Sequence, residues 1–374
     1  MALAPAGGGA RLEDHRFPCP ACGADLRYAP ETGGMRCDHC GHEEAIPDQR
    51  DGIAELDLRQ AERSALPDAA LEETRVARCE SCGAQVEFDA AIHASECPFC
   101  ASPLVTGTGV HRHIKPQAQL PFLVSEAEAR SAMVTWLGRR WFAPSNLQKF
   151  ARAERRMEGI YVPYWTYDAE TRSRYAGQRG TVRYETRQVP VTVNGKRQMS
   201  TQQVARVDWT QAQGSVARDF DDVLVLGSRS LPKTYTDALS PWDLSALSAY
   251  DPRYLAGFRA EGYGVPVEEA YAEARSVMNG VITEDVRRDI GGDQQRIDRL
   301  ETDVGRLTFK HVLLPVWIAA YRYRGNSYRF VVNGRTGSVE GERPYSAVKI
   351  GLAILLGLLV AIALASLQIS DMGR

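Results

Sequence analysis

The eight cysteines of this 374-residue chain fall into two sets of four with the same spacing. Within each set the cysteines form two pairs, each pair three positions apart, and 14 residues separate the pairs. Two thiolates at this spacing bind one ion from a tight turn, and two such turns complete a tetrahedron. The pattern predicts two structural zinc ribbons, each holding one Zn²⁺. The eight predicted ligands are Cys19, Cys22, Cys37 and Cys40 in the first ribbon, and Cys79, Cys82, Cys97 and Cys100 in the second.

Four protein ligands leave no coordination position for a water nucleophile, so the zinc is expected to fold the modules and not to catalyse a reaction. His39, His42 and His93 are expected on the surface, because both thiolate sets are complete without them. We assign residues 1–48 to the first ribbon, 49–76 to a helical linker and 77–106 to the second ribbon. Modules this small need metal binding to fold.

The two ends of the chain suggest a location. The N-terminus lacks the charged and apolar regions of a signal peptide, so the cysteines are expected in a reducing compartment as metal ligands. Residues 350–367 carry no charge and are apolar all round, which predicts a transmembrane helix within a C-terminal tail anchor at residues 347–370. Basic residues are concentrated before this segment, which predicts that the bulk of the chain is cytoplasmic.

Residues 107–346 are expected to form a larger mixed α+β domain, so the fold class predicted for the whole is α+β multidomain with antiparallel hairpins. A capping box at Ser125 and Glu128 predicts a helix start, and further helices are expected at 145–157, 267–288 and 293–304. Strands are expected at 182–193 and 198–209 around an Asn-Gly turn, and in a meander over 318–339. The linker is expected to contain short helices at 54–65 and 68–77.

Charge is unevenly distributed along the chain. Residues 1–110 hold 9 Arg, no Lys and 19 acidic residues, a net charge of −10, whereas residues 130–206 hold 15 basic and 5 acidic residues, a net charge of +10. Such a basic stretch attracts nucleic acid, anionic lipid or the acidic ribbons of the same or another chain. With a membrane anchor expected, an anionic lipid surface or ribbon docking is favoured, and nucleic acid is the weaker alternative.

Motifs for catalysis are lacking. The sequence has no Walker A loop, no G-x-S-x-G elbow, no H-E-x-x-H and no dinucleotide fingerprint, so no enzymatic activity is expected. The run Asp219, Asp221 and Asp222 has the ligands for a divalent cation, although such runs are more often solvated loops, and its role stays open. The six tryptophans fit core packing better than base stacking.

Several segments resemble a bacterial family of tail-anchored double zinc-ribbon proteins, described as TFIIB-type and sometimes as primosomal-helicase-like. The resemblance covers nearly the whole chain. Besides the cysteines, the segments that carry it are Leu120–Phe122, Arg140–Ser145, Gly159–Trp165, Leu314–Trp317 and Val332–Gly337.

The resemblance implies a bacterial inner-membrane location and an association with SPFH (flotillin-like) proteins. It does not imply a helicase, since the chain lacks an ATPase motor. The expected function is therefore a non-enzymatic, membrane-tethered adaptor whose zinc ribbons recruit a cytoplasmic protein partner, with an SPFH-type protein as candidate. The alternative is a zinc-ribbon nucleic-acid-binding protein related to replication or transcription factors.

Overall fold

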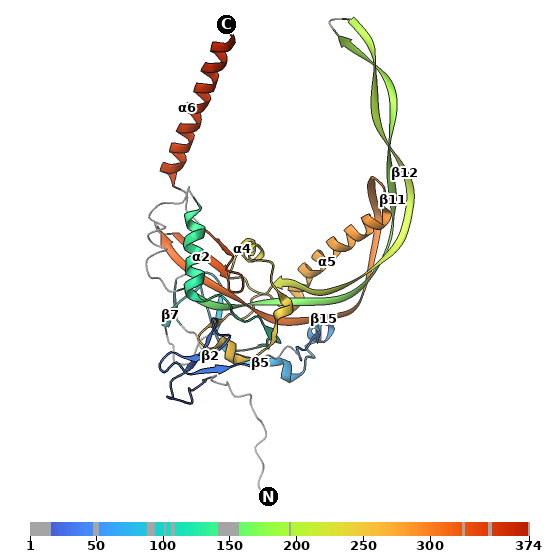
Figure 1. Cartoon of the computed structure of the whole chain (residues 1–374). Coiled ribbons are helices and arrows are strands. Elements are labelled where there is room, and N and C mark those ends of the chain that lie inside the picture. The colour runs from blue at the N-terminus through green and yellow to red at the C-terminus, as the bar shows by residue number, and fades with distance from the viewer. Residues whose placement is uncertain are drawn as a thin grey trace.

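Three very long antiparallel strands dominate the computed structural model of this chain (Figure 1). They are β11 (Glu158–Val193), β12 (Lys196–Leu226) and β15 (Gln294–Tyr323), with β11 in the middle. The structure describes residues 16–47, 52–87, 94–100, 102–105, 109–140, 157–193, 196–323, 326–342 and 346–372.

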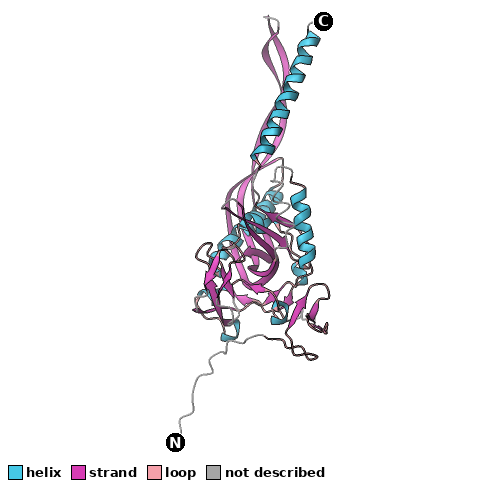
Figure 2. Cartoon of the chain, turned by 90° about the vertical axis from the view of Figure 1, so that its left-hand side faces the viewer, coloured by secondary structure: helices cyan, strands magenta, loops and turns pink. Residues whose placement is uncertain are grey.

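Shorter strands complete the central sheet, whose main order is β12-β11-β15-β10-β13. The added strands are β4 (Leu56–Asp57), β10 (Ala118–Gln119), β13 (Ser248–Ala249), β14 (Arg259–Ala260), β16 (Asn326–Asn333) and β17 (Val339–Gly341). Most pairings are antiparallel, whereas β14 runs parallel to β11 and β10 parallel to β15. The body is therefore built mainly of strands, as Figure 2 shows.

Three small sheets carry the cysteine segments. The first contains β1 (Leu26–Ala29), β2 (Gly34–Cys37) and β3 (Glu43–Ala45). The second contains β5 (Leu71–Arg78), β6 (Gln85–Glu87) and β9 (Gly109–Ile114), and the third is the hairpin of β7 (Ala94–Glu96) and β8 (Pro103–Val105).

The α-helices described are α1 (Leu58–Glu62), α2 (Glu126–Gly138), α4 (Lys233–Ala238), α5 (Val267–Ile290) and α6 (Ala347–Met372). Short 3₁₀ helices lie at Asp68–Ala70, Leu244–Ala246 and Pro252–Leu255. Helix α5 buries a stripe spaced three or four residues apart and lies against β12 and β11. The expected capping box is confirmed, since the Glu128 amide bonds to the side chain of Ser125 and the Ser125 amide to that of Glu128.

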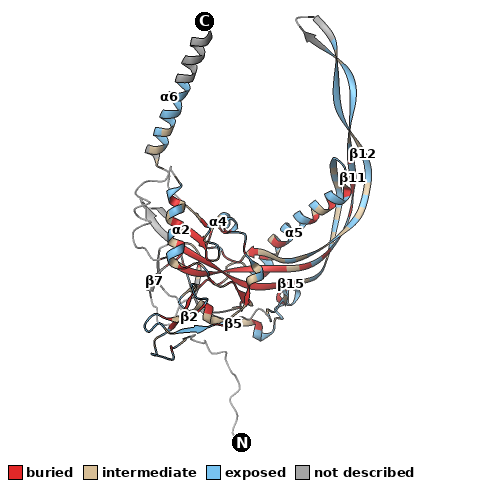
Figure 3. Cartoon of the chain, in the orientation of Figure 1, coloured by how far each residue is buried: buried red, intermediate tan, exposed pale blue. Residues whose placement is uncertain are grey.

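The core lies on both faces of the long strands, because successive side chains of a strand point to opposite faces. Tyr161 and Leu313 belong to one buried cluster, and Ile160 and Leu314 belong to another. The register pairs Tyr161 with Pro315 and Ile160 with Val316, so the two clusters occupy opposite faces of the sheet. Figure 3 shows that burial is concentrated where the strands cross the body.

Several predicted elements are confirmed, and the predictions of two helices are wrong. The structure confirms the helices at α2 and α5, the hairpin and the meander strands β15, β16 and β17, although β11 and β12 extend far beyond the expected hairpin. Residues 294–304 form part of β15, because pairing with β11 overrides their helical spacing of apolar residues. Residues 68–77 form a 3₁₀ turn and strand β5, which pairs with β9. The helix expected at 145–157 lies almost wholly outside the described residues.

The predicted fold class is wrong in two respects. A mixed α+β domain was predicted for residues 107–346, whereas the structure is mostly sheet with few helices. In addition, no helix in the part of the chain that the structure describes is long and apolar enough to cross a membrane. The predicted single-pass inner-membrane location and tail anchor at 347–370 are therefore not supported.

Candidate metal centres

The first set of four cysteines converges at one end of the β1–β2–β3 sheet. Cys19 and Cys22 precede β1, Cys37 ends β2, and Cys40 follows in the turn before β3. The sulfur of Cys19 lies 3.6 Å from that of Cys40, and the sulfur of Cys22 lies 3.5 Å from that of Cys37. Cys19 and Cys37 are buried, whereas Cys22 and Cys40 are exposed.

The second set repeats this arrangement between strand pairs. Cys79 and Cys82 lie in the turn between β5 and β6, and Cys97 and Cys100 in the turn between β7 and β8. The Cys79 and Cys100 sulfurs are 3.6 Å apart, and the Cys82 and Cys97 sulfurs are 3.7 Å apart. Three of these cysteines are buried and Cys82 is partly buried. The structure thus brings together all eight predicted ligands in the predicted sets.

Glycines shape three of the four turns. Gly23, Gly41 and Gly83 adopt φ values of 78°, 75° and 77°, a left-handed conformation that side chains disfavour. Each glycine amide donates to the carbonyl of the cysteine four positions earlier, at 2.8 to 2.9 Å. The chain therefore reverses tightly and presents both thiolates of the pair to one point. Ala101, which follows the fourth pair, lies outside the described residues.

The donor sets fit tetrahedral zinc. Zn–S bonds of about 2.3 Å in a tetrahedron place sulfur atoms about 3.8 Å apart, close to the observed 3.5 to 3.7 Å. In each set all four ligand atoms lie within 4.8 Å of one another. The chain therefore has two four-cysteine clusters able to hold zinc ions.

Local hydrogen bonds lower the pKa of one cysteine in each set. The backbone amide of Cys40 lowers the pKa of Cys37 to about 6. The side chain of Cys97 lowers the pKa of Cys82 to about 5. The pKa of a neighbouring cysteine, Cys22 or Cys97, is raised in turn, so protons must leave each set when four thiolates bind one cation.

The first ribbon packs against the body through an aromatic side chain on β1. The Tyr28 amide donates to the Ala256 carbonyl at 2.9 Å, and the Tyr28 hydroxyl donates to the Phe122 carbonyl at 2.9 Å. The Tyr28 ring lies 5.1 Å from that of Tyr254 and 6.2 Å from that of Phe258. This ribbon belongs to the cluster that contains Tyr161, on one face of the long strands.

The second ribbon packs on the other face. Phe99, between its last two cysteines, is fully buried in the cluster that contains Ile160 and Leu314. The Gly262 amide donates to the Gln85 carbonyl of β6 at 3.0 Å. The two ribbons therefore lie on opposite faces of one sheet, which the sequence did not indicate.

A glycine-rich segment, Gly257–Gly264, contacts both ribbons. Its glycine spacing does not match a phosphate-binding loop, and the structure shows what it does. Gly257 has φ of +90°, and a Cβ there would lie 3.2 Å from Cδ of Arg27 on the first ribbon. Gly262, five residues later, bonds to the second ribbon. Gly257 thus allows the close approach of the first ribbon, and the backbone of Gly262 binds the second.

A buried glutamate lies between these two contacts. Glu261 accepts hydrogen bonds from the hydroxyls of Ser228 and Ser230. Burial raises the pKa of Glu261 to about 8, so its carboxyl is largely protonated at neutral pH. A protonated, hydrogen-bonded carboxyl avoids the free-energy cost of a buried charge beside the second ribbon.

A lysine from β15 lies among the acidic side chains, at the position where a metal ion would bind. Asp221 and Asp222 lie with Asp168 in a cluster of carboxylates, and Asp219 is not part of it. The Lys310 ammonium lies 2.7 Å from Asp222 and 3.1 Å from Asp168. This buried ammonium balances the negative charge of the cluster, which is the structural role of an internal ion pair.

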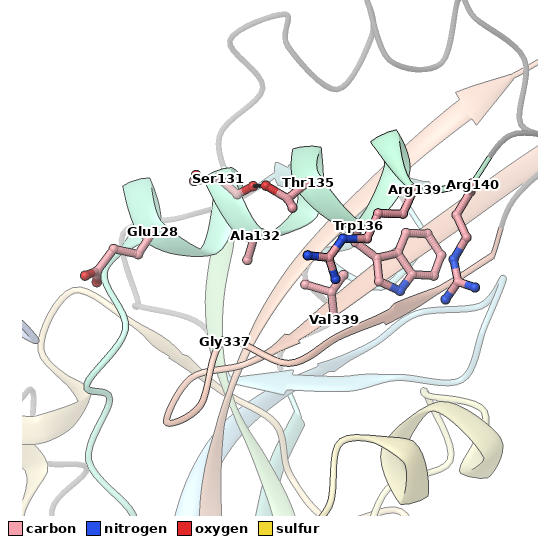
Figure 4. Close-up of a pocket in the computed structure, with 9 residues that line it drawn as sticks. All are labelled: Glu128, Ser131, Ala132, Thr135, Trp136, Arg139, Arg140, Gly337 and Val339. Carbon is pink, nitrogen blue, oxygen red and sulfur yellow. Dashed lines mark hydrogen bonds between the residues drawn. The ribbon is translucent and has the colours of Figure 1, made fainter.

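Open grooves flank helix α2. The groove in Figure 4 has a volume of about 720 Å³, and its walls are α2 and the segment before β17. The Arg140 guanidinium lies 4.6 Å from the centre of the Trp136 ring. Trp165, Trp242 and Trp317 are buried, as core packing predicts.

Comparisons with known proteins give one relative. The chain is 25% identical over 360 residues to the uncharacterized protein YdjG of Bacillus subtilis (strain 168), which covers 94% of this chain and 97% of that protein. No family model matches the chain, and no solved structure matches it. The double zinc-ribbon family suggested by the sequence is therefore supported only by its two four-cysteine clusters.

Proposed function

We propose that the protein is a non-enzymatic adaptor in which two structural zinc ions hold modules that bind a protein partner. One observation carries the proposal: both four-thiolate sets are closed, and each is packed into the core of the same sheet. Zinc in such a site stabilises a surface and has no open position for a reactant. Attachment to a membrane is not part of this proposal.

The partner surface is assigned to the acidic ribbon side. Residues 1–110 have a net charge of −10, and four thiolates around each Zn²⁺ add further negative charge. On the first ribbon, Glu43 and Glu44 of β3 are exposed at the edge of the small sheet. A partner with a basic surface complements this edge, and an SPFH-type protein remains the candidate suggested by the family resemblance.

Nucleic acid is the weaker alternative. Phosphate is repelled by the net charge of residues 1–110. The long hairpin has the shape of a ribbon that enters a major groove, but its described charges are balanced. Arg183 pairs with Asp208 at 3.1 Å, and Arg206 pairs with Glu185 at 3.4 Å.

A pull-down with the zinc-loaded full chain tests the proposal. Glu43→Lys/Glu44→Lys is compared with Glu284→Lys/Glu268→Lys, a control of equal charge change on helix α5. The expected result is a co-purifying protein that the β3 variant loses and the control retains. No co-purifying protein, or equal retention by both variants, would contradict the proposal. Salt-sensitive binding of the same full chain to a labelled DNA or RNA duplex would favour the alternative.

A further inference from the structure

The hairpin of β11 and β12 extends past the rest of the sheet as a two-stranded arm. Strand β15 accompanies β11 only as far as the pair Gly180 and Gln294. Beyond that pair, the described residues 181–190 of β11 pair with β12 alone. Figure 1 shows this arm extending from the body, and Figure 3 colours most of its described residues as exposed. A two-stranded ribbon is only marginally stable in water, which makes a further strand favourable.

A side chain closes the edge of β11 at the point where β15 begins. The Asp293 amide donates to the Gly180 carbonyl at 2.9 Å. The Asp293 carboxylate then accepts from the Val182 amide at 2.7 Å. This carboxylate takes the place of the next β15 residue, so Val182 is satisfied although the strand pairing has ended.

Three backbone amides follow on the same edge. Backbone groups of alternate residues point to the same edge of a strand, so Tyr184, Thr186 and Gln188 face the edge that Val182 faces. No described residue pairs with them there. Pro190, the next position on this edge, has no N–H. The open edge is therefore a defined site, limited by Asp293 at one end and by Pro190 at the other.

The charged side chains beside this edge can form opposite-charge pairs with the same edge of a second copy. Glu185 and Arg187 are exposed and lie on one face of β11, on either side of Thr186. Glu185 contacts Arg206 at 3.4 Å in a solvent-exposed pair. Among the described residues, Arg187 forms no ion pair. If two such edges run antiparallel about Thr186, each Glu185 lies opposite Arg187 of the other copy.

We propose that two copies of this chain pair through the free edge of β11, antiparallel, with Thr186 on the two-fold axis. Tyr184 of each copy then pairs with Gln188 of the other by backbone hydrogen bonds. Glu185 and Arg187 of the other copy form a non-hydrogen-bonded pair, where Cα atoms are about 4.5 Å apart and side chains meet. Past Pro190, each strand leaves the edge because Asp293 of the other copy occupies it.

The mass of the zinc-loaded full chain in solution tests this proposal. Thr186→Pro removes the central amide of the new ladder but no bond to β12, because Thr186 faces away from that strand. Gln203→Pro is the matched control, since Gln203 pairs with Thr186 and faces the outer edge of β12. The wild type and Q203P are expected to be dimers. In T186P the dissociation constant of the dimer is expected to rise about tenfold or more relative to the wild type. A monomeric wild type, or a loss caused by Q203P and not by T186P, would overturn the proposal.

Charge reversal tests the register. Arg187→Glu places like charges opposite each other twice per dimer and is expected to weaken the dimer about tenfold at low salt. The double variant Glu185→Arg/Arg187→Glu restores opposite charges and is expected to recover the dimer. Failure of this recovery, with circular dichroism unchanged, would overturn the register.

Cross-linking gives a third readout. At the two-fold axis the Thr186 Cα atoms are expected about 5.5 Å apart, within disulfide range. Thr186→Cys is expected to form a covalent dimer under mild oxidation of the zinc-loaded protein, and Gln203→Cys is not. Equal cross-linking of both variants would count against pairing through β11.

Discussion

The two metal centres have the same cysteine spacing but different surroundings. In the first, Cys22 and Cys40 are exposed, whereas in the second three cysteines are buried and Cys82 is partly buried. The first ribbon packs Tyr28, with Cys19 and Cys37, into the cluster on one face of the sheet, while the second inserts Phe99 into the cluster on the other face. The comparison shows that ligand spacing sets the chelate geometry, and packing of the intervening residues sets how far the metal is shielded.

This difference in burial predicts that the two metal centres contribute unequally to the stability of the fold. Loss of metal at the second ribbon removes support from a cluster that contains Leu120, Ile160 and Leu314 of the central sheet. Loss of metal at the first ribbon opens a module with half of its ligands already exposed to water. Stability is therefore expected to depend more on the second centre than on the first.

The largest effect is expected from ligand substitutions. Cys97→Ser and Cys22→Ser should each reduce bound zinc from two ions to one, because three thiolates hold zinc less tightly than four. Cys97→Ser should lower the free energy of unfolding by more than Cys22→Ser does, since Cys97 is buried and Cys22 is exposed. Zinc content by mass spectrometry and urea unfolding measure both. Equal destabilisation by the two variants would contradict the larger contribution of the second centre to stability.

Substitution of the two packing residues should give the next largest difference. Phe99→Ala removes a fully buried ring and should cost about 3–5 kcal/mol. Tyr28→Phe loses only the hydrogen bond to the Phe122 carbonyl and should cost about 1 kcal/mol. Urea denaturation of both zinc-loaded variants gives the values. A larger loss of stability in Tyr28→Phe than in Phe99→Ala would contradict the expected difference between the two ribbons.

A chelator should remove zinc from the two centres at different rates. A zinc chelator with a coloured complex is expected to remove one ion about tenfold faster than the other, because exposed Cys22 and Cys40 admit the competing ligand. The remaining zinc in Cys22→Ser should be released at the slow rate. Single-phase release of both ions would show that the difference in burial has no kinetic consequence.

A dependence of stability on pH is expected from a buried histidine. His311 is fully buried, its Nδ1 bonds to the Ile114 carbonyl after the second ribbon, and burial lowers its pKa to about 3. Because the unfolded chain binds this proton near pH 6.5 and the folded chain does not, stability falls as pH decreases below 6.5 towards 3. His311→Gln should reduce this slope by up to about 1.4 kcal/mol per pH unit. Identical slopes for both proteins in urea titrations would contradict it.

The metal sites were predictable because their chemistry is local. Four cysteines in two pairs, with Gly23, Gly41 and Gly83 after three of them, specify a chelate whatever the rest of the chain does. The helix at α2 was predictable for the same reason, since Ser125 and Glu128 form their capping bonds within one turn.

The long sheet and its contacts were not predictable. The spacing of Ile297, Leu300 and Val304 fits a helix, but these residues pair with β11 more than a hundred positions earlier in the chain. The contacts of Tyr28 with Ala256 and of Gln85 with Gly262 also join distant segments. Such pairings depend on tertiary packing, which a local pattern does not reveal.

Zinc analysis of the purified full chain, combined with X-ray absorption at the zinc edge, tests the central claim most directly. Two ions per chain are expected, each with four sulfur neighbours at about 2.3 Å and no oxygen or nitrogen ligand. Fewer than two ions, or a coordination shell containing lighter atoms, would contradict two closed four-thiolate centres.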